Sequence, residues 1–354
     1  MKKTLIKGNE AVVKSAILAG CRYYFGYPIT PASEIAHAAA KYFPLVGGTF
    51  LQAESEVSAI NMVYGASSCG VRVMTASSGP GISLKQEGIS YIAGAELPCL
   101  IVDVMRAGPG LGNIWAEQGD YNQVVKGGGH GNYKVPVLAP ASAQDMCDYT
   151  ALAFDIADKY RTPVYLFTDA YIGQMIEPVT FPEVDPQIKK DESKYSWQIR
   201  ASKDTRRNCI TSIVMSPSGM EELNIRLQEK YKQITENETR YETYKCEDAT
   251  YLIVAYGICS RLARTCIDKL RDQGIKIGLL RPITLWPFPS EAICSLVEKN
   301  KITQIISFEL SNGQMIDDIR LAVLARCKVT LLNRMGGVVP KESWIISSLL
   351  DLIK

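Results

Sequence analysis

A chain of 354 residues and 39.0 kDa is too long for one small module, and at about 100–200 residues per domain it is expected to form two domains. Hydrophobic residues make up 47% of the chain and charged residues 21%, a balance that excludes a disordered protein. Because 39 Lys and Arg residues nearly match 37 Asp and Glu residues, the net charge of +2 provides no basic surface for nucleic acid or anionic lipid.

The N-terminal segment indicates no export signal. Its sequence, MKKTLIKGNE, is basic, but Lys7, Asn9 and Glu10 interrupt it before the apolar core of a signal peptide could form. No apolar run approaches the roughly 18 residues of a membrane span. We therefore expect a cytoplasmic protein with neither a membrane nor a nucleic acid as partner.

Short apolar runs alternate with amphipathic stretches from residue 10 to about residue 170, a pattern typical of βα repeats around a mostly parallel sheet. Strands are predicted over residues 21–25, 71–76, 99–105, 135–138 and 164–167. Helices are predicted over residues 31–42, 56–67, 82–93 and 143–159. Ligands of such sheets bind beyond the carboxyl ends of the strands, which makes the loops 26–30, 77–81 and 106–112 the candidate binding segments.

The pattern changes between residues 181 and 246. Residues 185–208 are polar and lack periodicity, and residues 219–244 predict a long charged helix. Alternation resumes at residue 250, with strands predicted over residues 251–256, 276–280, 304–308 and near Val329, and helices over residues 260–273, 290–300 and 314–326. The sequence thus predicts an α/β domain over residues 1–180, a connector over 181–246 and a second α/β domain over 247–354.

The ten cysteines are scattered through apolar segments, and no two of them have CxxC spacing. The chain has only two histidines, His37 and His130. Zinc and iron–sulfur sites need several thiolate or imidazole ligands close together, so we expect reduced core cysteines and no metal site in this chain.

Residues 27–31, YPITP, follow the first predicted strand. Two prolines stiffen this turn and hold Thr30 near a helix N-terminus, where backbone N–H groups favour an anion. The Thr30 hydroxyl is therefore a candidate ligand for a carboxylate or a carbonyl group. The alternative is that Thr30 only caps the helix.

Glu56 stands in the first turn of a predicted helix of apolar and small residues. Val57, Ala59 and Ile60 would withdraw its carboxylate from water, which favours a hydrogen-bonding partner in place of solvent. The alternative is a surface glutamate that the helix dipole stabilises.

Arg106 ends the apolar run 100–105 and precedes a glycine-rich turn, AGPGLG. Its planar guanidinium would project into the ligand crevice, where it suits bidentate binding of a carboxylate. The alternative is a structural salt bridge, for example with Asp103.

In their order and approximate spacing these segments resemble the alpha subunit of the 2-oxoacid:ferredoxin oxidoreductases, in the pyruvate:ferredoxin oxidoreductase superfamily. The YPITP turn, the QAE-x-E-x-x-A helix containing Glu56 and the arginine–glycine turn are all present. Residues 280–289, LRPITLWPFP, are similar to the transketolase C-terminal domain of this family. The resemblance implies a thiamine diphosphate-type pyrimidine-binding domain, with helices on both faces of a parallel sheet, followed by a transketolase C-terminal-like α/β domain.

The resemblance also implies residue roles. Glu56 matches the catalytic glutamate that hydrogen-bonds N1′ of the thiamine diphosphate aminopyrimidine. Thr30 and Arg106 match the residues that hold the 2-oxoacid carboxylate and carbonyl. The reaction implied is the coenzyme A-dependent oxidative decarboxylation of a 2-oxoacid with reduction of ferredoxin.

The chain contains neither a GDG motif with paired asparagines nor a ferredoxin-like cysteine run. The resemblance places the Mg²⁺ and diphosphate site on a beta subunit, the link to coenzyme A on a gamma subunit, and iron–sulfur clusters on the beta subunit and a ferredoxin-like delta subunit. An obligate hetero-oligomer is therefore expected, with an isolated chain that is inactive.

The segment after Arg106, AGPGLGNIWAEQGDY, is most similar to the 2-oxoisovalerate type, which acts on branched-chain 2-oxoacids. The alternatives are 2-oxoglutarate or pyruvate as substrate, a lipoamide-linked 2-oxoacid dehydrogenase component, and a non-catalytic scaffold subunit.

Overall fold

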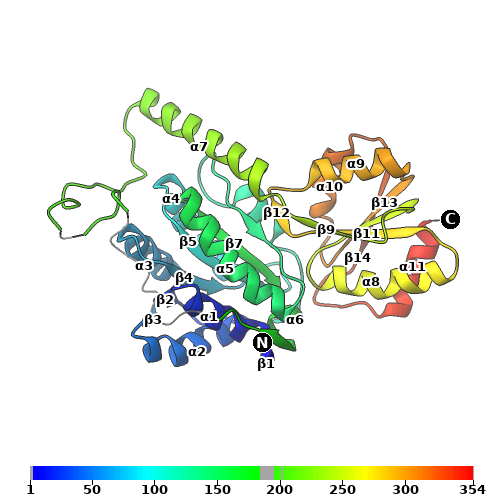
Figure 1. Cartoon of the computed structure of the whole chain (residues 1–354), viewed down its shortest axis with the longest axis horizontal. Helices are drawn as coiled ribbons and strands as arrows, with labels where there is room; N and C mark the ends of the chain where they lie inside the picture. Colours follow the sequence, from blue (N-terminus) through cyan, green and yellow to red (C-terminus); the bar gives the residue numbers. More distant parts are fainter. Residues whose placement is uncertain (1–2, 184–194, 201, 354) are drawn as a thin grey trace.

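The computed structural model describes residues 3–183, 195–200 and 202–353, in which two sheets lie side by side (Figure 1). The larger sheet is parallel except for its edge strand β12, which runs antiparallel to β6. Its seven strands follow one another in the order β12 (Thr284–Trp286), β6 (Val137–Leu138), β7 (Pro163–Asp169), β5 (Cys99–Met105), β4 (Val73–Ser77), β2 (Tyr23–Gly26) and β3 (Thr49–Gln52).

Helices cover both faces of this sheet, and the burial of its central strand β5 reflects this. All seven of its residues are buried, because a parallel strand with helices on both sides has no solvent-facing side. Leu100 and Val102 belong to the core on one face, and Ile101 belongs to the core on the other. The first face carries α1 (Gly8–Leu18), α2 (Ser33–Tyr42) and α5 (Ala143–Tyr160), and the second carries α3 (Glu56–Ser68) and α4 (Pro80–Gly94).

The smaller sheet has five strands and is also parallel, except for β9, which runs antiparallel to β11. The order is β14 (Lys328–Asn333), β13 (Gln304–Glu309), β10 (Tyr251–Val254), β11 (Ile277–Pro282) and β9 (Tyr241–Tyr244). In Figure 1 one face carries α9 (Ser290–Asn300) and α10 (Met315–Val323), and the other carries α8 (Gly257–Asp272) and α11 (Glu342–Leu352).

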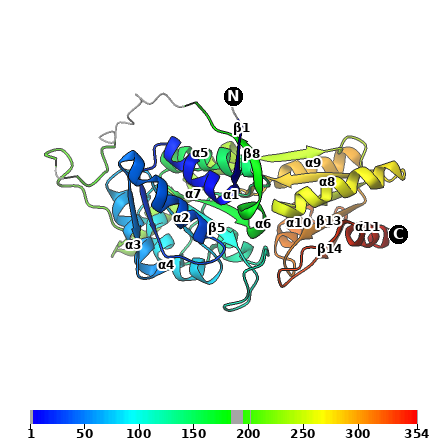
Figure 2. The same ribbon diagram turned by 90° about the horizontal axis from the view of Figure 1, so that it is seen from below.

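A charged helix, α7 (Pro217–Glu238), precedes β9 and buries one side against the main core through Leu223, Leu227, Tyr231 and Ile234. A two-stranded antiparallel pair, formed by β1 (Lys3–Lys7) and β8 (Ile176–Thr180), lies beside α1 and α5 (Figure 2). Three short helices complete the chain: η1 (Pro44–Val46), η2 (Asn122–Gly127) and α6 (Ala170–Gln174).

The predicted α/β fold class is confirmed, whereas the helix predicted in the connector is too long. The helix expected to reach residue 244 ends at Glu238, and residues 241–244 form strand β9. The reason is the run Tyr241-Glu242-Thr243-Tyr244, whose aromatic and β-branched residues favour a strand. Residues 185–194 and 201 of the polar segment 185–208 lie outside the described ranges. The division into domains stays a prediction.

No helix in the described ranges is long and apolar enough to cross a membrane. The expectation of unpaired cysteines is confirmed, since all ten are free and six of them are buried.

Candidate active site

A cleft of about 740 Å³ lies where the carboxyl ends of strands from both sheets meet. Strands β4 and β5 of the larger sheet lead into Gly79 and Arg106, which line it. Strands β13 and β14 of the smaller sheet lead into Ser311 and Gly336 on the opposite wall. Because ligands of parallel α/β sheets bind at the carboxyl ends of the strands, the cleft is the candidate active site.

Two consecutive side chains join the walls of the cleft. Glu117 is buried and accepts hydrogen bonds from the backbone N–H of Gly108 at 2.9 Å and of Gly336 at 2.7 Å. Gln118 accepts a hydrogen bond from the backbone N–H of Leu310 at 2.9 Å. These bonds fix the loops after β5, β13 and β14 relative to one another, so the shape of the cleft depends on both sheets.

Arg106 is 7% exposed and is held by backbone carbonyl groups. Its Nη1 donates to the oxygen of Thr30 at 2.9 Å, and its Nη2 donates to the oxygen of Leu111 at 2.8 Å. Its Nε is buried and has no partner. The alternative of a salt bridge to Asp103 is wrong, since Arg106 pairs with no carboxylate of the described residues.

Thr30 is exposed and does not cap a helix. Residues 30–32 form a turn, so α2 begins only at Ser33, and no side chain caps it. The capping interpretation of Thr30 is therefore wrong. The contact between Thr30 and Arg106 uses the Thr30 backbone carbonyl, which leaves its hydroxyl free to meet a ligand.

Glu56 is the first residue of α3, because the Ser55 hydroxyl caps the helix by accepting the Ser58 N–H at 3.2 Å. Its side chain is 6% exposed, so the interpretation as a surface glutamate is wrong. Across the described ranges, no protein group donates a hydrogen bond to its carboxylate. A Cβ atom at Gly81 would lie 2.7 Å from Glu56 Oε1, which leaves glycine as the residue that fits there.

The turn after β4 and the first residues of α4 lie between Arg106 and Glu56. A Cβ atom at Gly79 would lie 3.5 Å from Arg106 Cγ, whereas Gly81 adjoins Glu56. The hydroxyls of Ser77 and Ser78, just before Gly79, are buried without partners. The segment that joins β4 to α4 thus contacts Arg106 and Glu56, and Thr30 adjoins it through Arg106, although Arg106 alone of the three lines the cleft itself.

Residues 14–243 match the family model described as pyruvate flavodoxin/ferredoxin oxidoreductase, thiamine diphosphate-binding, and residues 249–344 match pyruvate:ferredoxin oxidoreductase core domain II. The chain belongs to the pyruvate flavodoxin/ferredoxin oxidoreductase family. The resemblance seen in its sequence motifs is therefore confirmed.

Among relatives in this family, the ketoisovalerate oxidoreductase subunit VorB of Methanothermobacter thermautotrophicus is 59% identical, covering 95% of this chain and 94% of the relative. The 2-oxoglutarate synthase subunit KorA of Archaeoglobus fulgidus is 38% identical, covering 98% of each chain. A solved structure, the 2-oxoglutarate:ferredoxin oxidoreductase of Magnetococcus marinus with 2-oxoglutarate, coenzyme A and succinyl-CoA bound, aligns with a TM-score of 0.87 at 26% identity. The alignment covers all of the present chain and 66% of the Magnetococcus marinus chain.

Lys85 adjoins Glu56, although no sequence motif indicates it. It lies in α4 with no exposed surface, and its Nζ donates a hydrogen bond of 3.4 Å to the backbone oxygen of Glu56. Burial lowers the pKa of Lys85 to about 8, although the charge of Glu56 opposes this shift. The sequence contains the signal, because Lys85 falls three residues after Ile82 and four before Ile89 on the apolar stripe of the helix.

Two neighbouring acids lie at the cleft wall, one fully buried behind it and one partly exposed to the cleft. Asp103 in β5 is fully buried, and neither of its carboxyl oxygens has a hydrogen-bond donor among the described residues. Burial, followed by the neighbouring Asp120 carboxylate, holds the pKa of Asp103 well above its usual range. Burial raises the pKa of Asp120, which lines the cleft, to about 6 against the lowering effect of a hydrogen bond from Gln123. A proton held between the two carboxyl groups would supply the missing donor.

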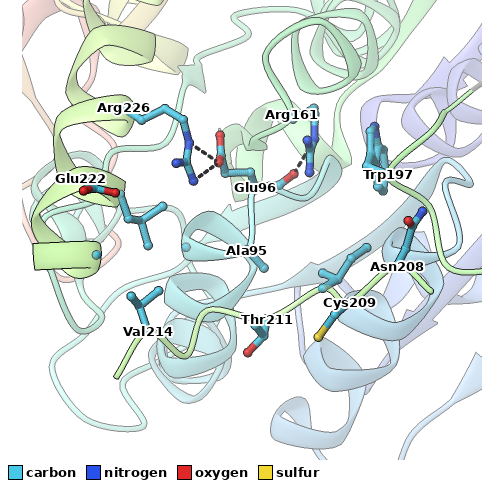
Figure 3. Close-up of a pocket in the computed structure, with 14 residues that line it drawn as sticks. Ala95, Glu96, Arg161, Trp197, Asn208, Cys209, Thr211, Val214, Glu222 and Arg226 are labelled. Carbon is cyan, nitrogen blue, oxygen red and sulfur yellow. Dashed lines mark hydrogen bonds and ion pairs between the residues drawn. The ribbon is translucent and has the colours of Figure 1, made fainter. Parts of the chain in front are cut away.

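A different pocket, of about 460 Å³, lies near the amino ends of strands in the larger sheet, beside the residues that precede β5 (Figure 3). There the Arg161 guanidinium stacks on the Trp197 ring at 4.6 Å. Glu96 pairs with Arg226 at 2.9 Å and with Lys230 at 2.5 Å. Because these charges are paired within the protein and none of the predicted site residues lines this pocket, the cleft remains the better candidate site.

Proposed function

We propose that this chain is the alpha subunit of a thiamine diphosphate-dependent 2-oxoacid:ferredoxin oxidoreductase whose substrate is 2-oxoisovalerate or another branched-chain 2-oxoacid. The choice of substrate is supported by the 59% identity to a ketoisovalerate oxidoreductase subunit, against 38% to a 2-oxoglutarate synthase subunit. The proposed reaction converts a 2-oxoacid, the coenzyme A thiol and two oxidised ferredoxins into acyl-CoA, carbon dioxide, two reduced ferredoxins and one proton.

The observation that carries this proposal is the environment of Glu56. Glu56 as a residue is only 6% exposed, no described residue donates to its carboxylate, and Gly81 leaves space beside it. A buried carboxylate without a donor is unfavourable unless a ligand supplies one. The residues therefore fit the aminopyrimidine of thiamine diphosphate, in which ring N1′ would donate a hydrogen bond to Glu56 when that nitrogen carries a proton.

When bound, thiamine diphosphate supplies the carbanion and the electron sink for decarboxylation. The residues of this chain position and orient the reactants. Arg106 would hold the substrate carboxylate with its unpartnered Nε and a remaining Nη2 hydrogen, while its bonds to Thr30 and Leu111 keep the guanidinium in place. The free Thr30 hydroxyl would donate to the substrate carbonyl.

The proposed complex contains further subunits. A beta subunit would hold Mg²⁺ and the diphosphate, a gamma subunit would contribute to coenzyme A binding, and a ferredoxin-like delta subunit would pass electrons to ferredoxin. The absence of a GDG motif from this chain supports this arrangement. In the described ranges, no group of three or more His, Cys, Asp and Glu side chains is arranged to hold a metal ion.

The test replaces Glu56 by Gln in the chain co-purified with its partner subunits. Reduction of a low-potential viologen dye, dependent on 2-oxoisovalerate and coenzyme A, should fall at least 100-fold. The matched control is Glu54→Gln, because Glu54 is two residues away but exposed to solvent, and this variant should keep full activity. Full activity of the Glu56→Gln complex would refute the proposal, and a higher kcat/KM for 2-oxoglutarate or pyruvate in the wild-type complex would correct the substrate.

A further inference from the structure

Lys85 is a buried cation with few partners. Its single described hydrogen bond, to the Glu56 backbone oxygen, is long at 3.4 Å, although an ammonium group has three donors. Among the described residues, Glu56 of α3 is the one charged side chain that shifts the pKa of Lys85. No charged group of α4 or of the strands beneath it does so. The fold alone gives no reason for a charge at this position.

An apolar residue would suit the position better from the standpoint of stability. Lys85 lies on the stripe that α4 buries, together with Ile82, Ile89 and Ile92. Burying an ammonium group without full hydrogen bonding destabilises the folded chain. Residues that break the local rules of folding in this way are expected at functional sites.

We propose that Lys85 is a positioning residue whose ammonium group holds the first turn of α3 and balances the charge of Glu56, so that the Glu56 carboxylate stays beside Gly81 as an acceptor. This inference rests on the proposed function, because it assumes that Glu56 binds the aminopyrimidine ring. Lys85 itself need not touch the cofactor. Its effect passes through Glu56.

The pH dependence provides a second consequence. Because burial lowers the pKa of Lys85 to about 8, its ammonium loses its proton at a mildly alkaline pH. The positive charge of Lys85 that balances the Glu56 carboxylate is then lost. The affinity of the wild-type complex for thiamine diphosphate should therefore weaken as the pH rises from 7 to 9.

The experiment titrates thiamine diphosphate with Mg²⁺ into the cofactor-free complex of the chain with its partner subunits and follows the heat of binding. Lys85→Met, which keeps an unbranched side chain one atom shorter and without charge, should weaken binding at pH 7 at least 10-fold and remove the change between pH 7 and 9. Lys85→Gln keeps a donor but no charge and should weaken binding to a similar extent. The control is Lys230→Met. Lys230 is a partly buried lysine of α7 that pairs with Glu96 away from the cleft, and the affinity of this variant should stay within twofold of wild type.

Thermal unfolding separates a positioning effect from misfolding. Lys85→Met should unfold at a higher temperature than wild type, because a buried charge is removed. Wild-type affinity and an unchanged pH dependence in both Lys85 variants would overturn the inference. If Glu56→Gln also binds with wild-type affinity, the proposed function fails as well; if Glu56→Gln binds weakly and Lys85→Met does not, only the role of Lys85 fails.

Discussion

Arg106 and Thr30 are 76 positions apart in the sequence, yet Arg106 Nη1 donates to the Thr30 backbone oxygen at 2.9 Å. This bond fixes the guanidinium while Nε stays free. Replacing Arg106 by Lys would retain the charge but lose the paired donors that suit a carboxylate. A hydrogen bond to a charged group contributes about 1.5–3 kcal/mol, so we expect kcat/KM for the 2-oxoacid to fall roughly 10- to 100-fold.

The control for this change is Arg226→Lys in α7, at the pocket of Figure 3, where the arginine pairs with Glu96. That variant should keep the wild-type kcat/KM in steady-state assays of dye reduction. If Arg106→Lys is equally active, Arg106 has a structural role only.

Thr30 offers a separate prediction, because its carbonyl and its hydroxyl have different tasks. Thr30→Ala retains the backbone oxygen that binds Arg106 and removes only the hydroxyl. We expect a fall of roughly 5- to 15-fold in kcat/KM, corresponding to about 1–1.5 kcal/mol for one hydrogen bond. Thr30→Ser, which retains the hydroxyl, should restore most of the rate. Equal rates for the Ala and Ser variants would show that the hydroxyl does not meet the substrate.

The central elements of the fold are predictable because their apolar patterns are continuous. Strand β5 and helix α9 have the bounds that the sequence predicts. The edge strands β3 and β12 are not predicted by the sequence. They are short, and pairing with a neighbour distant in sequence defines them, as Thr284 pairs with Leu138 in β6.

The candidate site is predictable where a motif marks it and not where packing creates it. Motifs identify Glu56, Thr30 and Arg106. The structure places Arg106 beside Gly79, Glu56 beside Gly81, and Thr30 in contact with Arg106. The joining role of Glu117 depends on Gly336, 219 residues away, and no local pattern indicates this contact. No motif marks Lys85, although its charge interrupts an apolar stripe.

Gly81 allows a test of the space beside Glu56. In Gly81→Ala the new Cβ would lie 2.2 Å from Ser77 Oγ and 2.7 Å from Glu56 Oε1, so the Glu56 side chain must move. We expect the affinity for thiamine diphosphate to fall at least 10-fold in calorimetric titrations of the complex.

The matched control is Gly65→Ala, since Gly65 lies in α3, is exposed, and has nothing within 4 Å of the position that the new methyl group would occupy. It should bind thiamine diphosphate normally and gain up to about 1 kcal/mol of stability from the better helix propensity of alanine. Normal binding by Gly81→Ala would mean that the ring does not depend on the position of Glu56.

The neighbouring carboxyl groups of Asp103, which is buried, and Asp120, which is partly exposed, should make the stability of the chain fall as the pH rises. The folded-state pKa of Asp103 is raised by burial and by Asp120, while an unfolded aspartate titrates near pH 3.9. The folded chain therefore binds more protons than the unfolded chain above about pH 4, so this contribution is fully present below pH 4 and is lost at higher pH. For Asp120, whose pKa is about 6, the loss falls between about pH 4 and pH 6.

Asp103→Asn removes the ionisation and retains a group that can donate to Asp120. Its free energy of urea unfolding, relative to wild type, should therefore increase between pH 4.5 and pH 8. Each pKa unit of difference corresponds to about 1.4 kcal/mol, so a gain of more than about 1 kcal/mol is expected across this range. The exposed Asp272 provides the control, because Asp272→Asn should follow the wild-type curve. A curve for Asp103→Asn parallel to wild type would mean that Asp103 does not hold a proton in the folded chain, and the two carboxyl groups would then need another donor to satisfy their oxygens.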